Sequence, residues 1–195
     1  MKVYKDFIVT PIGERYSNSK KVGEKELVLN TDIFNHQYVN RLAKVIATPI
    51  LFQSPINVGD EIVIHHNVFR RWNDVKGEER NSRSYWKEGK YIISEDQIYL
   101  YKREDWKAMP GYCFVKPLKS IDKFNVDSER PLSGIIKYTD GAHDKNELVG
   151  FRPGSEYEFI INGERLYRVM NKFITIKYEY QGNEEEYNPS WAQSG

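Results

Sequence analysis

Residues Val58 to Ile64 read Val-Gly-Asp-Glu-Ile-Val-Ile, a Gly-Asp turn followed directly by an apolar strand. Glycine reaches positive φ without steric cost, and a small polar residue after it closes a tight turn. A second stretch with the same order of residue types, Pro-Gly-Ser-Glu-Tyr-Glu-Phe-Ile, runs from Pro153 to Ile160. Two such turn-to-strand transitions predict a duplicated small β-barrel.

The segments on both sides of these two turns also occur in matching order. Upstream, residues 5–12 and 111–118 are each a short apolar strand that ends in proline and one further apolar residue. Downstream, residues 91–101 match residues 166–176 as a closing strand. An internal period is the sequence signature of a repeated structural unit, so we expect two copies of one fold.

In the ordered set of these parts, the chain resembles the bacterial co-chaperonin GroES and its relatives. Members of that family run strand, long mobile loop, strand, roof loop, Val-Gly-Asp turn, and a closing strand that carries a Ser-Glu-x-Asp-Ile-like turn. The matching parts in this chain are residues 7–11, 16–37, 42–47, 48–57, 58–64 and 94–100. The resemblance covers nearly all of residues 1–103 and, more loosely, residues 109–179.

The resemblance implies an all-β fold of two tandem GroES-like small β-barrels. Residues 1–108 would form a barrel with a mobile loop, residues 109–180 a second, degenerate barrel, and residues 181–195 a flexible tail. The implied function is a co-chaperonin that caps a GroEL-type chaperonin ring and assists protein folding, without chemistry of its own. It also implies a homo-oligomeric ring in which edge strands such as Phe7–Pro11 pair with a neighbouring copy.

The first loop carries the residues that would contact the partner. Residues 14–26 are rich in Ser, Asn, Lys and Glu and cannot bury enough apolar area to offset ordering entropy, so we expect a mobile loop. The apolar residues Leu27, Val28 and Leu29 follow, either as a short strand packed on the barrel or as a tag for a partner's hydrophobic groove. The resemblance favours the tag, because the family loop carries an Ile-Val-Leu-like triplet that docks on the chaperonin. The Gly-Gly that precedes the family triplet is replaced here by Lys25-Glu26.

A second apolar group, Ile50, Leu51 and Phe52, lies between Pro49 and Pro55. By position it matches the roof loop that lines the dome opening in the family. A turn packed into the core is the alternative, and the residues alone leave both open.

Residues 65–90 contain the side chains most suggestive of chemistry. Adjacent residues of a strand point to opposite faces, so we expect that His65 and His66 do not share a metal ion. Arginines interleaved with Trp and Tyr could bind nucleic acid, but acidic residues in the same stretch offset their charge. An elongated, exposed hairpin is therefore favoured. The acidic residues are Asp74, Glu78, Glu79 and Glu88.

The composition and the motifs argue against several classes of protein. Lys and Arg total 29 against 28 Asp and Glu, so no strong field attracts nucleic acid or an anionic membrane. No leader or membrane-spanning run is evident, and we expect a soluble, cytoplasmic protein. The sequence contains no P-loop, dinucleotide fingerprint, nucleophile elbow or paired metal ligands, so we expect no enzyme activity, metal or cofactor.

Two local patterns give sharper structural expectations. The single cysteine, Cys113, lies between Tyr112 and Phe114 in a strand-like run and is expected to be a small buried apolar residue. Asn162-Gly163 is typical of a type I′ hairpin turn.

A second function is compatible with the same sequence. The chain could be a non-enzymatic structural or assembly protein, of a virus for example, that uses the barrel as an oligomerisation module. The second loop, residues 119–131, has no apolar triplet, which fits such a role. The segment 17–30 discriminates between the two: a tag is expected to order on a partner, and a structural segment to pack on its own barrel.

Overall fold

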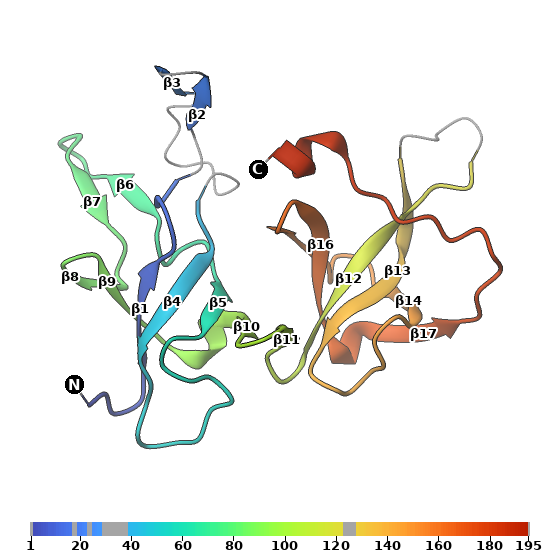
Figure 1. The fold of residues 1–195 in the computed structure, drawn as a ribbon, viewed down its shortest axis with the longest axis horizontal. Helices are drawn as coiled ribbons and strands as arrows, with labels where there is room; N and C mark the ends of the chain where they lie inside the picture. The colour runs from blue at the N-terminus through green and yellow to red at the C-terminus, as the bar shows by residue number, and fades with distance from the viewer. Residues whose placement is uncertain (1, 17–18, 23–24, 29–38, 123–127, 195) are drawn as a thin grey trace. The chain divides into compact units, whose positions relative to one another are not determined.

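The computed structural model describes residues 2–16, 19–22, 25–28, 39–122 and 128–194 (Figure 1). The chain is all-β, as predicted from the sequence: strands dominate, and the helical segments in the described residues are short 3₁₀ turns. These turns are η2 (Glu95–Gln97), η3 (Asn171–Phe173) and η4 (Ser190–Ser194). Among the residues described, no helix has the length and apolar character needed to cross a membrane.

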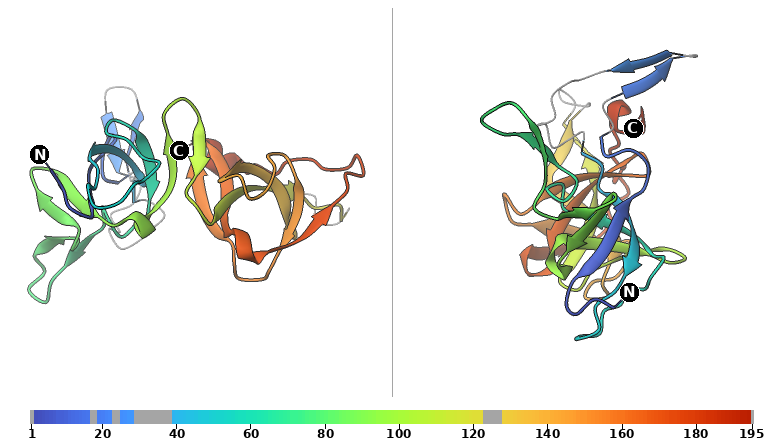
Figure 2. Two further views of the ribbon diagram at one scale, coloured as in Figure 1. Left: turned by 90° about the horizontal axis from the view of Figure 1, so that it is seen from below. Right: turned by 90° about the vertical axis from the view of Figure 1, so that its left-hand side faces the viewer.

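The chain divides into two compact units, Met1–Asp105 and Trp106–Gly195. The first unit holds strands β1 to β10, and the second begins with β11 (Trp106–Ala108). In Figure 2 the first unit is coloured from blue to green and the second from yellow-green to red.

The first unit is built on one antiparallel sheet and two separate hairpins. Six of its strands lie in the order β10-β5-β4-β1-β9-β8, with β1 between β4 and β9. The pairs β2-β3 and β6-β7 form two-stranded sheets of their own. The strands are β1 (Phe7–Pro11), β2 (Ser19–Val22), β3 (Lys25–Val28), β4 (Leu42–Ala47), β5 (Glu61–Ile64), β6 (Arg71–Asn73), β7 (Glu79–Asn81), β8 (Tyr85–Lys87), β9 (Lys90–Ile93) and β10 (Ile98–Lys102).

The second unit contains a six-stranded antiparallel sheet in the order β15-β16-β12-β13-β14-β17. Its hairpin turn between β15 and β16 has positive φ at both Asn162 (52°) and Gly163 (73°), which confirms the predicted type I′ geometry. The strands are β12 (Tyr112–Lys119), β13 (Glu129–Thr139), β14 (Leu148–Phe151), β15 (Tyr157–Ile161), β16 (Glu164–Met170) and β17 (Ile174–Tyr178).

The two sheets share one strand order. Read from one end, the first is β10-β5-β4-β1-β9-β8 and the second is β17-β14-β13-β12-β16-β15, so each strand has a counterpart at the same place in the chain. A 3₁₀ turn also precedes the last strand in both, η2 before β10 and η3 before β17. The two units are therefore built on the same topology.

This correspondence corrects one detail of the predicted repeat. The counterpart of β5, which follows the Val58-Gly59-Asp60 turn, is β14 and not the strand after Pro153-Gly154. The Pro153-Gly154 turn instead precedes β15, whose counterpart is β8. A glycine turn followed by acidic and apolar residues is common to many turn-to-strand transitions, so residue types alone did not fix the alignment.

Neither strand order closes on itself: in the described residues β8 does not pair with β10, and β15 does not pair with β17.

The strand Phe7–Pro11 was predicted to be an edge strand that pairs with a neighbouring copy, and the structure places it differently. Both of its edges are occupied, by β4 and by β9, which makes it an interior strand. Pairing with another chain needs an open edge, and β1 offers none at Ile8 and Val9, which pair with β4 on one side and β9 on the other.

The turn that begins β5 is stabilised by a buried carboxylate, that of Asp60. Gly59 has a φ of 95°, a conformation that a Cβ disfavours. Asp60 is only 5% exposed; its carboxylate accepts a hydrogen bond from the Asn57 backbone N–H (2.9 Å) and pairs with Arg103 (3.2 Å). A buried carboxylate needs such partners, so the Gly-Asp pair fixes where the strand starts.

Alternating strand residues supply the core of each unit. In β4 every second residue is buried, and in the first unit Phe7, Phe69 and Tyr91 are among the largest fully buried side chains. In the second unit, buried side chains from strands β12, β13, β14 and β16 form one cluster, and Cys113 belongs to it. Cys113 is fully buried, which confirms the predicted small buried apolar residue, and burial raises the pKa of its thiol to about 12. The cluster contains Cys113, Val115, Ile136, Val149, Phe151, Tyr167 and Val169.

The residues after β17, predicted to be a flexible tail, contact the second unit. Glu186 forms an antiparallel bridge with Leu118, and the Tyr187 N–H donates to the Pro117 carbonyl at 2.8 Å. Further along, Ala192 is 1% exposed. The tail thus adds backbone pairing to the end of β12, beyond the part that pairs with β16.

Candidate functional site

The segment that the sequence marks as a partner-binding loop leaves and rejoins the first unit at one point. Tyr16 and Val39 form an antiparallel bridge there, and the two residues are 5% and 4% exposed. The Asn40 N–H donates to the Arg15 carbonyl at 2.9 Å. We call these four residues the neck, because they hold together the two ends of residues 17–38.

The Asn40 side chain fastens the neck to the sheet. Its amide nitrogen donates to the carbonyls of Ile12 (2.7 Å) and Glu14 (2.8 Å), and its amide oxygen accepts from the Leu42 N–H (2.8 Å). One side chain therefore joins the end of β1 to the beginning of β4. Three hydrogen bonds from a single Asn use most of the donors and acceptors that the residue has.

The predicted contact residues lie beyond this neck. The backbones of Leu27 and Val28 belong to β3, which pairs in register with β2 so that Lys20 is opposite Leu27 and Ser19 is opposite Val28. Their side chains, and all of Leu29, lie outside what the structure describes. The pairing of β2 with β3 makes part of the predicted loop a short hairpin with a separate two-stranded sheet.

The predicted roof-loop residues are on the surface of the first unit. Ile50 and Leu51 are 55% and 67% exposed, so the alternative of a turn packed in the core does not describe them. Phe52 is 37% exposed and contacts the buried Phe7 edge to face, with ring centroids 6.4 Å apart. The backbone N–H groups of Ile50 and Leu51 donate to the Tyr4 carbonyl, which fixes the tip against the segment before β1.

The two histidines of residues 65–90 are arranged differently from the prediction. β5 ends at Ile64, so His65 and His66 belong to a turn and their rings stack, with centroids 4.3 Å apart. The prediction that the two side chains point to opposite faces of a strand is therefore wrong. The His65 Nδ1 accepts a hydrogen bond from the Asn67 N–H at 3.1 Å. Within the described parts of the chain, no group of three or more His, Cys, Asp or Glu side chains has the arrangement of a metal site.

Arginines and acids of the same stretch form ion pairs on the β6-β7 hairpin. Arg71 pairs with Glu79 at 3.0 Å across the two strands. At the hairpin tip, Arg80 pairs with Asp74 (2.8 Å) and with Glu78 (2.5 Å). The β7 side chains are exposed, in line with an elongated surface hairpin.

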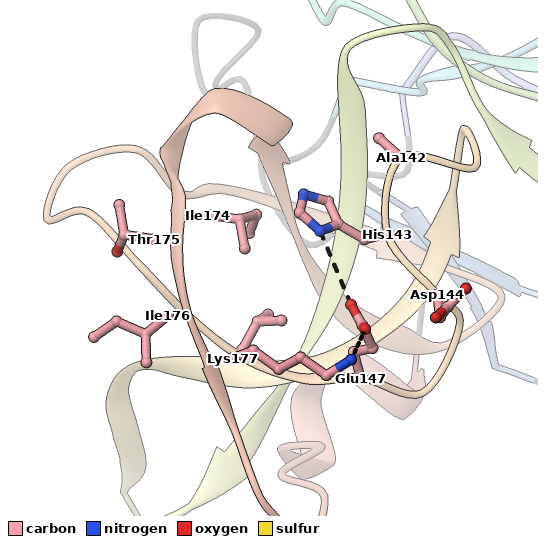
Figure 3. Close-up of a pocket in the computed structure, with 9 residues that line it drawn as sticks. Ala142, His143, Asp144, Glu147, Ile174, Thr175, Ile176 and Lys177 are labelled. Atoms are coloured by element: carbon pink, nitrogen blue, oxygen red, sulfur yellow. Dashed lines mark hydrogen bonds and ion pairs between the residues drawn. The ribbon is translucent and has the colours of Figure 1, made fainter.

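A shallow cavity of about 300 Å³ lies in the second unit, between the loop before β14 and strand β17 (Figure 3). At its centre the Glu147 carboxylate faces Lys177 on one side and the His143 Nδ1, at 3.9 Å, on the other. The hydrogen bond from Lys177 lowers the pKa of Glu147. The Glu147 carboxylate is thus already engaged within the protein, and a second carboxylate, that of Asp144, also lines the cavity.

Comparison with known proteins adds no family assignment. No protein-family model matches this chain, and a search of curated proteins finds no match.

Proposed function

We propose that this protein is a co-chaperonin that caps a GroEL-type chaperonin ring through residues 17–38. The observation that carries the proposal is the neck: Tyr16 and Val39 are bridged and buried, and the segment between them carries Leu27, Val28 and Leu29. A long polar segment with one apolar triplet, held at both ends by a rigid sheet, can present that triplet to a hydrophobic groove. The resemblance of the ordered sequence parts to GroES supports the same interpretation.

Binding through such a segment would be reversible because ordering entropy offsets part of the contact energy. Burial of one large apolar side chain is worth about 1.5–3 kcal/mol, so three residues supply useful but limited affinity. In a ring of copies, linked segments act through effective concentration and many weak contacts become tight capping. The partner would hydrolyse the nucleotide, and this chain would contribute binding alone.

The duplicated strand order gives the proposal a division of labour. The counterpart of residues 17–38 in the second unit is the shorter connection between β12 and β13, which has no apolar triplet. Its base is joined by the Ser120 N–H, which donates to the Ser128 carbonyl at 2.9 Å. The first unit would therefore carry the contact with the chaperonin, and the second would extend the cap as a repeated GroES-like module.

The test is a triple substitution, Leu27→Ser, Val28→Ser and Leu29→Ser, compared with the matched control Val75→Ser. Val75 is a fully exposed apolar residue at the tip of the β6-β7 hairpin, 104% exposed. We expect the triple variant to lose capture by a GroEL-type chaperonin in the presence of nucleotide, with an unchanged melting temperature. Undiminished capture, or a melting temperature lowered by several degrees, would refute the tag.

A structural or assembly role is the second candidate, and the open sheet edges favour it. β8 and β15 each end a strand order in the described residues and can pair with a strand from another chain. This hypothesis predicts a stable homo-oligomer that does not bind the chaperonin. Light scattering coupled to size exclusion, run with and without chaperonin and nucleotide, separates the two functions.

A further inference from the structure

The segment between β5 and β8, which includes the β6-β7 hairpin, contacts the neck through two arginines. One is Arg15 of the neck itself, and the other is Arg71 of β6. In the second unit the corresponding connection, between β14 and β15, contains no described strand, so β6 and β7 are an addition of the first unit. The unit that carries the addition is also the one that carries the long segment 17–38. The contacts between the two indicate what the addition does.

Arg15 is the first link. Its guanidinium donates to the Phe69 carbonyl from Nη2 (2.9 Å) and Nε (3.2 Å), and to the Asn81 Oδ1 from Nη1 (2.8 Å). Phe69 is itself fully buried, with its ring 4.8 Å from that of Tyr91, so the accepting carbonyl belongs to the core. The guanidinium also lies 5.5 Å from the centroid of the Tyr91 ring. Arg15 thus connects the neck to the core and to β7.

Arg71 is the second link, and it acts on the next residue of the neck. Its backbone N–H donates to the Tyr16 hydroxyl at 2.7 Å, and its guanidinium lies over the Tyr16 ring at 4.7 Å. The Nη1 of the same guanidinium contacts both carboxylate oxygens of Glu79, at 3.0 and 3.2 Å. Because charge-assisted hydrogen bonds restrain a guanidinium strongly, Glu79 helps to set the position of the group that covers Tyr16.

We infer that the β6-β7 hairpin is a brace for the neck, and that Arg15 and Arg71 are positioning residues for the segment 17–38. Where it concerns partner binding by residues 17–38, this inference rests on the proposed function. A long segment loses affinity when its ends are free, because more conformations must be given up on binding. A neck fixed on the Arg15 side by the core and on the Tyr16 side by β6 limits that loss.

The experiment compares Arg15→Gln and Tyr16→Phe with the control Arg80→Gln in the full chain. A glutamine side chain cannot reproduce the forked donors of Arg15, and a phenylalanine in place of Tyr16 removes the acceptor of the Arg71 N–H. Arg80 belongs to the same hairpin, but its guanidinium pairs with Asp74 and Glu78 at the tip. Amide hydrogen exchange is measured at Asn40, whose N–H closes the neck, and at Ile93 in the core.

We expect both neck variants to lose protection at Asn40 several-fold, with Ile93 unchanged, and the control to match the wild type at both positions. Equal protection at Asn40 in all four proteins would overturn the brace. A loss at Ile93 as well would assign the substituted residue to general stability instead, which also overturns it. This readout needs no chaperonin, so it stands even if the proposed function fails.

The same proteins then test positioning. The neck variants should bind a GroEL-type chaperonin more weakly than the control does, so a synthetic peptide of residues 17–38 should displace them from it at a lower concentration. Weaker Asn40 protection with unchanged chaperonin affinity would show that the neck is braced but that the brace does not serve binding, which refutes the positioning role. Absence of chaperonin binding by the wild type would refute the proposed function and leave the exchange result intact.

Discussion

The Tyr167 hydroxyl donates to Glu129, lying 2.7 and 2.9 Å from its two carboxylate oxygens, and Arg165 binds the same carboxylate at 2.8 Å. Burial and the Glu129 hydrogen bond both raise the pKa of Tyr167. Arg165 also pairs with Glu158, and its guanidinium lies over the ring of Trp191 in the tail, 5.6 Å from the centroid. β13, β16 and the tail are therefore joined at one polar cluster.

The first prediction concerns this cluster. Glu129→Ala removes partners from a buried hydroxyl and from a mostly buried guanidinium, whereas Tyr167→Phe removes one hydroxyl alone. Because an unpaired buried polar group costs about 1–3 kcal/mol, Glu129→Ala should lower the free energy of unfolding more than Tyr167→Phe does. Urea denaturation of both variants measures the order. A larger loss in Tyr167→Phe would contradict the assignment of Glu129 as the shared acceptor.

The second prediction concerns pH and the tail. Glu185 pairs with Lys119 at 2.6 Å, and that hydrogen bond lowers the pKa of Glu185 below its ordinary 4.5. A carboxylate with a lowered folded-state pKa stabilises the folded form above its unfolded pKa, and the contribution disappears as pH falls through the folded value. Because the pair is exposed to solvent, we expect its contribution to be small.

Acidification from neutral to below about pH 4 should therefore weaken the attachment of the tail by a small amount before the sheet unfolds. Fluorescence of Trp191, measured against the variant Trp191→Phe to remove the signal of the other tryptophans, follows this change. The Glu185→Gln variant has no carboxylate to pair with Lys119. The pH midpoint of its fluorescence change should therefore differ from that of the wild type. An identical midpoint in the two proteins would rule out this pair as the acid-sensitive contact.

The third prediction uses a close approach in β13. A Cβ placed on Gly134 would lie 2.3 Å from the Lys116 carbonyl oxygen and 2.5 Å from the Val115 Cγ1. Backbone cannot yield as a side-chain end does, so Gly134→Ala should destabilise the protein by about 1–3 kcal/mol or more. At Gly150 the nearest atoms, at 3.0 and 3.1 Å, belong to the Tyr178 ring end. Gly150→Ala should therefore cost less, and thermal melting of both variants compares them.

The fourth prediction concerns Cys113. Its thiol is fully buried, donates to the Val169 carbonyl at 3.6 Å, and has a pKa raised to about 12 by burial. The thiolate is the reactive form, so native protein at neutral pH should not react with a thiol reagent over the time in which a free thiol is consumed. Labelling should begin only as urea unfolds the second unit. Rapid labelling of native protein would contradict the burial of this residue.

Local chemistry was the most predictable part of this fold. Gly59 and the Asn162-Gly163 turn need positive φ, and the sequence identifies the residues that accept it. The burial of Cys113 between aromatic neighbours followed from composition in the same way. Each of these conclusions depends on residues adjacent in the chain.

Partners distant in the chain could not be predicted. The sequence does not show that Phe7–Pro11 is flanked on both sides, because strand order depends on pairing with residues 42–47 and 90–93. The arrangement of His65 and His66 was predicted wrongly because β5 ends at Ile64, before both histidines.

The neck had a signal that sequence reasoning did not use. Arg15, Tyr16 and Asn40 border the polar segment on either side, and polar side chains with several donors and acceptors at the borders are suited to closing a loop. Their partners Phe69 and Arg71, however, are more than fifty residues away from Arg15 and Tyr16. Only the folded chain brings them together.

The bridged neck also makes the first unit a host for foreign sequence. Once Tyr16 and Val39 are held together, the closure entropy of the segment between them grows only logarithmically, by about 0.6 kcal/mol for each doubling of its length. A peptide epitope or a reporter helix can therefore be grafted between these two positions at small thermodynamic expense. The sheet would hold both ends of the graft in place, and the sequence of the graft could be chosen for each use.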